Sequence, residues 1–335
     1  MKVLEVNKPI IAVMPEHAHA LSIISAHESY ENWIFSNLIQ VFHDQKAVVD
    51  NDKLLIRFLD DGFIHKSRIT KFEEVQKSTF SRWFSDVLKP LMDCIDNNTY
   101  IITLLDSFYI PKHRPYYKTI HRPHMTLIYG YCLIEQCFFI ADFFEGFYSF
   151  EKASFEEVRL GFENVPPGDW SKVSLIQKGE NQYNFDLHHV IKSIKEYKLS
   201  ICPHEQVLRG TNNMFNNVYG LDAYRIMLEL IPFYFALGEE CMDIRSFHLM
   251  YEHKKLMILR LNILGSIFKI DSELIQGFKE IEQEALILRN IGLKYLLTKN
   301  KQCIENILIL LTRLIKKEDE LLSQLLDIKG IKILT

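Results

Sequence analysis

Short apolar runs separated by turn residues dominate the first half of the chain, and this pattern predicts β-strands. The clearest runs span 54–59, 100–106, 124–131 and 138–144, and turn residues at 60–62 end the first of them. Only a few residues separate the last two runs. We therefore predict that 124–131 and 138–144 pair as an antiparallel hairpin.

Helical signals also occur in this half. Apolar positions between 21 and 42 fit helices that are interrupted near 27–30. Ser154 precedes a short amphipathic stretch and is placed to cap a helix there. The first half is therefore predicted to be an α+β domain that begins with a helix and has an antiparallel sheet whose strands come later.

Adjacent prolines and a glycine at 164–169 stop both helix and sheet. We predict a boundary there, between an α+β domain at 1–165 and a second domain at 170–335. Beyond the boundary, apolar residues recur at helical spacing, which predicts an all-α helical domain. Its predicted helices span 186–198, 221–237 with a kink at Pro232, 243–268, 272–297 and 302–327.

Composition narrows the function classes. Of the 335 residues, 48% are hydrophobic and 24% are charged, which is typical of globular proteins. A formal net charge of -4 gives no electrostatic reason to expect nucleic acid or an anionic membrane as a partner. The longest apolar runs, such as 307–311, are too short to span a bilayer, and no secretory signal pattern opens the sequence. Six cysteines are scattered without a CxxC pair, so we expect neither a disulfide framework nor a cysteine zinc site, and we predict a cytoplasmic protein.

The hairpin brings one histidine and one aspartate together. His124 opens its first strand and Asp142 lies near the end of its second, so the two side chains are predicted to touch. A carboxylate on one imidazole nitrogen fixes the tautomer and leaves the other nitrogen free to act as a base. The alternative is that both are ordinary turn or edge residues.

The thirteen histidines raise the question of a metal site. His17 and His19 share a face only on a strand, whereas His121 and His124 share one only on a helix, which Pro123 disfavours. No HExxH motif, phosphate loop or dinucleotide fingerprint occurs. We therefore predict no bound metal and no cofactor.

Several segments, in order, resemble a known family. They are similar to the N-terminal domain of the butirosin biosynthesis protein H family, a papain-like fold found in antibiotic and nonribosomal-peptide gene clusters. The matching segments are 105–111, Tyr117, 124–131 and 140–142, with 243–247 and 252–257 resembling the helical half that accompanies such domains.

The resemblance implies a cysteine-protease-like arrangement in which a helix supplies the nucleophile, a strand supplies the base and the next strand supplies its partner. His124 would be the base and Asp142 the residue that orients it. Family members transfer an aminoacyl group from a carrier-protein thioester to an amine. The expected partners are therefore an acyl or peptidyl carrier protein, or a peptide synthetase, and an amine-bearing small molecule.

The chain departs from the family at the nucleophile, because no cysteine precedes Cys94. Ser22 is the candidate replacement on the first helix, although it lies one turn too deep and is alternatively a plain helix serine. His17 and His19 are candidate pocket residues at the expected site, with Tyr131 as a further pocket residue. Their alternative is an ordinary structural role.

Two functions follow from these expectations. The first is an acyltransferase or amide synthase that acts on carrier-bound intermediates in specialised-metabolite biosynthesis, with His124 as general base. The second is a catalytically inactive, papain-like binding or scaffold subunit of such an assembly. The sequence identifies neither the substrate nor the oligomeric state.

Overall fold

The computed structural model describes residues 1–43, 54–59, 69–84, 86–166, 168, 170–203 and 217–334. Residue contacts divide the chain into two compact units, each built from two segments. Unit 1 comprises Met1–Glu31 and Asp61–Tyr183, and unit 2 comprises Asn32–Asp60 and Asn184–Thr335. The turn predicted at 60–62 lies outside the described residues.

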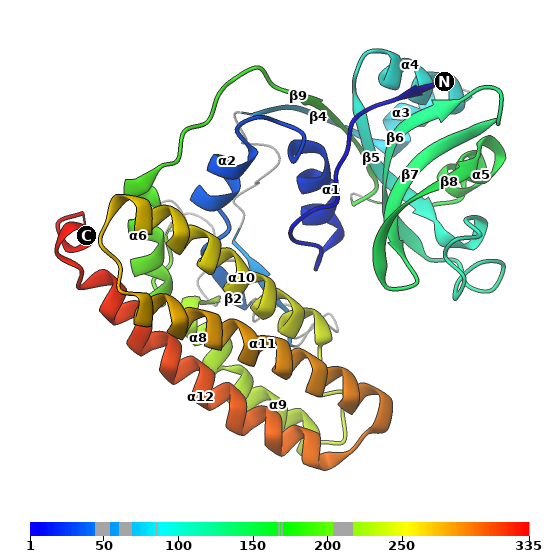
Figure 1. Ribbon diagram of the computed structural model, residues 1–335. Coiled ribbons are helices and arrows are strands. Elements are labelled where there is room, and N and C mark those ends of the chain that lie inside the picture. The colour runs from blue at the N-terminus through cyan, green and yellow to red at the C-terminus, as the bar shows by residue number, and fades with distance from the viewer. Residues whose placement is uncertain are drawn as a thin grey trace. The chain divides into compact units, whose positions relative to one another are not determined.

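Unit 1 is built around a seven-stranded antiparallel sheet (Figure 1). The strand order is β4-β9-β5-β6-β7-β8, and β1 pairs with β6 off this path. The strands are β1 (Lys2–Val3), β4 (Thr70–Gln76), β5 (Tyr100–Asp106), β6 (Pro123–Cys132), β7 (Cys137–Phe144), β8 (Phe147–Ser154) and β9 (Lys172–Lys178). The central strand β5 is almost entirely buried, as its continuous apolar run requires.

The hairpin predicted from the apolar runs is confirmed as β6 and β7, which pair antiparallel from Leu127 opposite Ala141 to Cys132 opposite Cys137. The boundary predicted at 164–169 differs from the division into units, because unit 1 continues to Tyr183. Beyond it, β9 lies between β4 and β5 in the same sheet. The proline-rich segment therefore connects two elements of one unit.

Helices α1 (Pro15–Ile24), α3 (Lys77–Trp83), α4 (Leu88–Asp96) and α5 (Phe155–Glu163) complete unit 1, with a short 3-10 helix η2 (Ser107–Tyr109) after β5. The predicted serine cap is present: Ser154 accepts a hydrogen bond from the amide of Glu157, whose carboxylate accepts one from the amide of Ser154. Buried residues from the strands and from these helices form one hydrophobic core.

Unit 2 is mainly helical. Helix α2 (Tyr30–Ser36) leads into it from unit 1. The other helices among its described residues are α6 (Leu187–Lys198), α8 (Gly220–Arg225), α9 (Met227–Ala236), α10 (Ile244–Ile267), α11 (Ser272–Thr298), α12 (Lys301–Leu326) and α13 (Lys329–Lys332). The three long amphipathic patterns are confirmed as α10, α11 and α12. Pro232 lies inside α9.

The expectation that residues 170–335 are all-α is wrong in two respects. Strand β9 (Lys172–Lys178) lies in this range and belongs to the sheet of unit 1, and β10 (Val218–Tyr219) belongs to a second sheet. This three-stranded antiparallel sheet in unit 2 consists of β2 (Val41–His43), β3 (Ile56–Phe58) and β10. Two of these strands come from the first half of the chain, so a prediction that treated the halves as separate domains had no means of pairing them.

The interior of unit 2 contains a buried ion pair. The Nζ of Lys254 on α10 lies 2.6 Å from Oε1 of Glu318 on α12, and both side chains are fully buried. Lys254 also donates to the hydroxyl of Tyr197. Because neither charge reaches solvent, each depends on the other for compensation.

None of the helices in the described residues is both long and apolar enough to cross a membrane.

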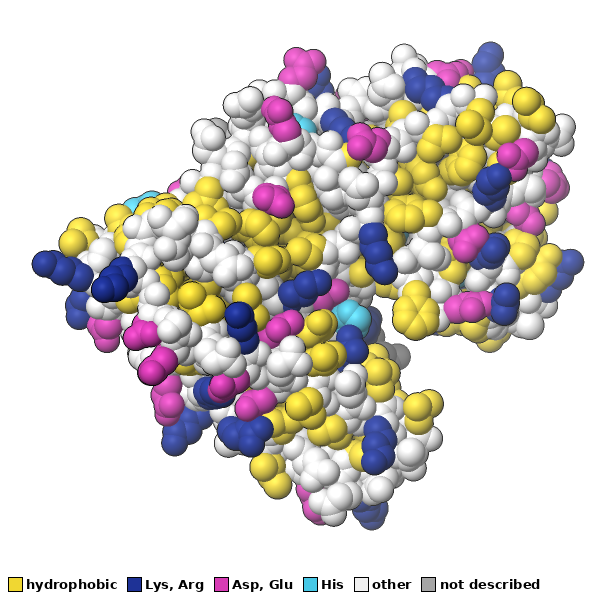
Figure 2. All heavy atoms as spheres, in the orientation of Figure 1, with side chains coloured by type: hydrophobic (Ala, Val, Ile, Leu, Met, Phe, Trp, Pro, Cys, Tyr) yellow, Lys and Arg dark blue, Asp and Glu magenta, His cyan; other side chains and the backbone are white. Residues whose placement is uncertain are grey.

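Figure 2 shows hydrophobic side chains gathered on the visible face of unit 1 over β6 and β7. Aromatic side chains meet across these strands, with Tyr129 packed on Phe139 and on Phe150 of β8.

Candidate active site

The predicted contact between His124 and Asp142 is present in unit 1. His124 lies near the start of β6, opposite Leu105 of β5, and Asp142 lies on the neighbouring strand β7. The Nδ1 of His124 is 2.7 Å from Oδ1 and 2.9 Å from Oδ2 of Asp142. Since a carboxylate only accepts hydrogen bonds, Nδ1 carries the proton and donates it.

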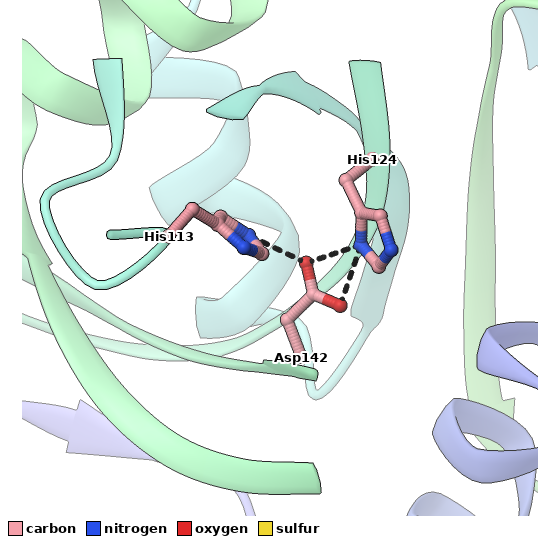
Figure 3. A group of neighbouring side chains, drawn as sticks. All are labelled: His113, His124 and Asp142. Carbon is pink, nitrogen blue, oxygen red and sulfur yellow. Dashed lines mark hydrogen bonds and ion pairs between the residues drawn. The ribbon is translucent and has the colours of Figure 1, made fainter. Parts of the chain in front are cut away.

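Asp142 is the centre of a larger cluster (Figure 3). Its carboxylate is not exposed to solvent, and four hydrogen-bond donors among the described residues contact it. These are His124, the Nε2 of His113 at 3.1 Å, the hydroxyl of Thr126 at 2.9 Å and the amide of Phe143 at 2.6 Å. A buried carboxylate with this many donors is held rigidly in its charged form.

His113 enters the cluster from the loop that follows η2. Its amide donates to the carbonyl of Ile110, and its own carbonyl accepts from the amides of Tyr116 and Tyr117, which fixes the turn. The His113 ring also packs against Phe144 at a centroid distance of 4.8 Å. Sequence reasoning missed this residue, because no spacing rule links a loop histidine to an aspartate 29 residues later.

Asp142 and His124 each stabilise the charged form of the other. Burial alone would raise the pKa of Asp142, but hydrogen bonds from His113 and His124 outweigh it and hold the pKa well below its usual range. Burial alone would lower the pKa of His124, but the hydrogen bond and the charge of Asp142 overcome it, and the pKa is raised. The cluster therefore keeps Asp142 ionised and favours a proton on the His124 ring.

His124 is the member of this cluster that reaches solvent. Its side chain is 23% exposed, compared with 4% for His113 and none for Asp142. In Figure 3, the second ring nitrogen of His124 points away from the carboxylate. With Nδ1 protonated, this nitrogen, Nε2, carries the lone pair of the neutral ring, and it is the atom able to accept a proton.

Helix α1 contributes His19 to the neighbourhood. Pro15 occupies the first turn of α1, where its missing N–H costs no hydrogen bond. The Nε2 of His19 is 2.9 Å from the carbonyl oxygen of Met125, and its Nδ1 is 3.0 Å from the hydroxyl of Tyr148. Burial lowers the pKa of His19. The neutral ring therefore donates through Nε2 and accepts through Nδ1, so both nitrogens are used in packing α1 against the sheet.

The other predicted site residues lie apart from the cluster or are engaged in the fold. Ser22 is buried on α1, and its hydroxyl donates to the carbonyl of Asn7 at 2.7 Å. His17 is buried on the same helix. Tyr131 lies seven residues beyond His124 on β6, about 23 Å along the strand, and its hydroxyl donates to Asp96. Tyr131 therefore lies away from the cluster, and the Ser22 hydroxyl is used within the fold.

A second histidine–aspartate pair lies at the same end of the sheet, and sequence reasoning missed it. The Nδ1 of His121 is 2.7 Å from Oδ2 of the buried Asp106, the last residue of β5. The His121 ring stacks on Phe108 at 4.1 Å and is 61% exposed. Since Asp106 is opposite Pro123 in the β5–β6 ladder, the two pairs are close neighbours along β6.

A cavity of about 430 Å³ in unit 1 does not belong to this site. Its walls include Trp83 and Phe84, and it borders Asn97 and Thr99, which precede β5. Its lining residues on the sheet come from β4 and β9, whereas His124 lies on β6, on the other side of β5. The cluster is therefore a partly exposed site at the surface of the sheet, remote from this cavity.

Comparisons with known proteins assign the chain to no family. No family model matches the chain, and no curated protein matches it either.

Proposed function

We propose that this protein forms an amide by transferring an acyl group from a carrier-protein thioester to an amine, with His124 as the general base. The observation that carries the proposal is the bond from the His124 Nδ1 to the buried Asp142 carboxylate. This bond leaves Nε2 as the basic atom of the one cluster side chain that is substantially exposed.

The proposed reaction balances without a covalent intermediate. The amine nitrogen attacks the thioester carbonyl while the His124 Nε2 accepts its proton, and the carbon–sulfur bond breaks. The thiolate leaves and takes the proton back from the imidazolium. Asp142 holds the ring in the required tautomer and stabilises the cation that forms.

Direct attack by the amine is favoured because α1 offers no nucleophile. Its sequence has no cysteine, and the Ser22 hydroxyl is committed to the Asn7 carbonyl. The choice of donor and acceptor rests on the resemblance to the butirosin biosynthesis protein H family and its papain-like fold. General base catalysis of this kind contributes about 10²- to 10⁴-fold in rate.

The test uses the full-length protein with an aminoacyl thioester of a carrier protein or of N-acetylcysteamine, a primary amine, and mass spectrometry of the amide. His124→Gln removes the base, and we expect the rate to fall by about 10²- to 10⁴-fold. His121→Gln is the matched control, because it removes the exposed histidine of the neighbouring pair, and it should keep the wild-type rate. Full activity in His124→Gln, or no amide above the uncatalysed background with wild-type protein, would contradict the proposal.

A specific observation favours a second candidate, a non-catalytic binding subunit of the same assembly. The polar groups of His19 and Ser22 on α1, where the resemblance places the nucleophile, are used in internal hydrogen bonds. This candidate predicts that the protein forms a complex with a carrier protein or peptide synthetase in size-exclusion chromatography while no amide appears.

A further inference from the structure

We propose that His113, His124 and Asp142 bind a divalent transition-metal ion, with Zn²⁺ the best fit. The three come from the loop after η2, from β6 and from β7, and their ligand atoms all lie within 4.8 Å of one another. Metal binding does not depend on the proposed acyl transfer. Only its inhibitory consequence, described below, rests on that function.

The two nitrogen–oxygen spacings in the cluster suit an ion of this size. Oδ2 of Asp142 is 3.1 Å from Nε2 of His113 and 2.9 Å from Nδ1 of His124. Ligands at about 2.0–2.2 Å from Zn²⁺ stand roughly 2.9–3.4 Å apart in tetrahedral or octahedral arrangements. Two imidazoles and one carboxylate also form the donor set that favours zinc over calcium or magnesium.

Surrounding groups hold the ligands in place before any ion arrives. Thr126 and the amide of Phe143 donate to Asp142, and Phe144 supports the ring of His113. Such outer contacts orient metal ligands and increase affinity. Because Asp142 and His113 are buried and Nδ1 of His124 faces Asp142, the ion would be held largely away from solvent.

The ion and the catalytic tautomer exclude each other. An ion bound at Nδ1 of His124 displaces the proton that now points at Asp142, and the neutral ring then carries its proton on Nε2. Nε2 becomes a donor and is unable to accept a proton from an amine. Zn²⁺ is therefore expected to inhibit amide formation, and a chelator should restore it.

Direct binding is the primary test. The full-length protein, stripped with a chelator, is titrated with Zn²⁺ in competition with a chromogenic chelator, and we expect one equivalent to bind. His113→Gln keeps a side-chain donor for Asp142 but offers no imidazole. It should weaken binding by more than the roughly 10- to 100-fold that loss of an outer contact costs. His121→Gln is the control and should bind Zn²⁺ as the wild type does.

Co²⁺ supplies an independent readout of the ligands. A visible d–d spectrum without thiolate charge-transfer absorption would identify nitrogen and oxygen ligands and exclude the cysteines. Circular dichroism and thermal unfolding would show that His113→Gln is folded.

The proposal is overturned if wild-type protein binds no Zn²⁺ in competition with the chelator. It is also overturned if His113→Gln binds as tightly as wild type, or if the Co²⁺ spectrum shows thiolate ligands. Zn²⁺ binding without amide formation would refute the proposed function alone. Amide formation without Zn²⁺ binding would refute only this inference.

Discussion

Replacing Asp142 by asparagine tests the electrostatic core of the candidate site. The carboxylate is fully buried and accepts hydrogen bonds from His113, His124, Thr126 and a backbone amide. Asparagine has a single acceptor oxygen. Its side-chain NH2 group would therefore face donors that now hydrogen-bond to the second carboxylate oxygen. The protonated His124 ring also loses its counter-charge.

The magnitude follows from these contacts. Removing one partner of a buried, hydrogen-bonded ion pair costs about 3–5 kcal/mol of unfolding free energy. Thr126→Val is the matched control, because it removes one of the four donors without changing the charge. Loss of that single bond to a charged group is expected to cost about 1.5–3 kcal/mol.

The effect of Asp142→Asn depends on pH in a direction fixed by the two pKa shifts. The pKa of Asp142 is lowered, so its contribution is complete above the unfolded value of about 3.9 and is lost as the pH falls toward the folded value. The pKa of His124 is raised by Asp142, so that contribution is present below about 6.5 and is lost as the pH rises through the folded value. The stability gap between wild type and Asp142→Asn is therefore greatest near about pH 5–6.

The assay is urea unfolding followed by circular dichroism at about pH 2.5, 5.5 and 8, with chelator present so that no ion occupies the cluster. The Asp142→Asn gap should be largest at the middle pH, whereas the Thr126→Val gap should be the same at about pH 5.5 and 8. A gap for Asp142→Asn that stays constant with pH, or one below about 1 kcal/mol at about pH 5.5, would refute the electrostatic account of the cluster.

Three further predictions concern the rest of the fold. Burial lowers the pKa of Lys77 to about 7, so the unfolding free energy of wild type should rise between about pH 7 and 10 relative to that of Lys77→Met, by up to about 1.4 kcal/mol per pH unit. Urea unfolding of the two proteins that gives the same dependence on pH would contradict this. Lys254→Met alone should cost about 3–5 kcal/mol in urea unfolding, because it leaves Glu318 charged and buried, and Lys254→Met with Glu318→Leu should cost less than the single change. Gly130→Ala places a Cβ 2.8 Å from the carbonyl oxygen of Lys2, so it should cost about 1–3 kcal/mol and speed amide exchange in β1; unchanged exchange there would argue against the close approach.

The sequence predicted the parts of the fold whose pattern is local. The central strands β5, β6 and β7 are continuous apolar runs, and α10, α11 and α12 repeat apolar residues over many turns. Strands β4 and β9 escaped prediction, because β4 mixes partly buried and exposed positions, β9 has only two fully buried residues, and both strands include charged residues. Their place in the sheet is set by pairing with each other across about 100 residues of sequence, which no local window contains.

The candidate site likewise has one part that the sequence predicted and one part that it did not. The His124–Asp142 pair was predictable, because a hairpin fixes which strand ends meet and both residues lie on its strands. His113 was not, because its approach to Asp142 depends on how the loop after η2 folds back over β7. The spacing rules applied to His17, His19, His121 and His124 reject a metal site, since those rules describe ligands on a single helix or strand.

His113 changes the chemistry that the pair alone would allow. A lone His–Asp pair at the end of a hairpin has one imidazole proton directed at one carboxylate, and base catalysis is its natural use. A second imidazole aimed at the same oxygen creates two nitrogen donors around one anion, and this is also the arrangement that a metal ion occupies when it replaces those protons. The atom bound at Nδ1 of His124 therefore decides which of the two proposed uses is open to the site: a proton there leaves Nε2 basic, and a metal ion there does not.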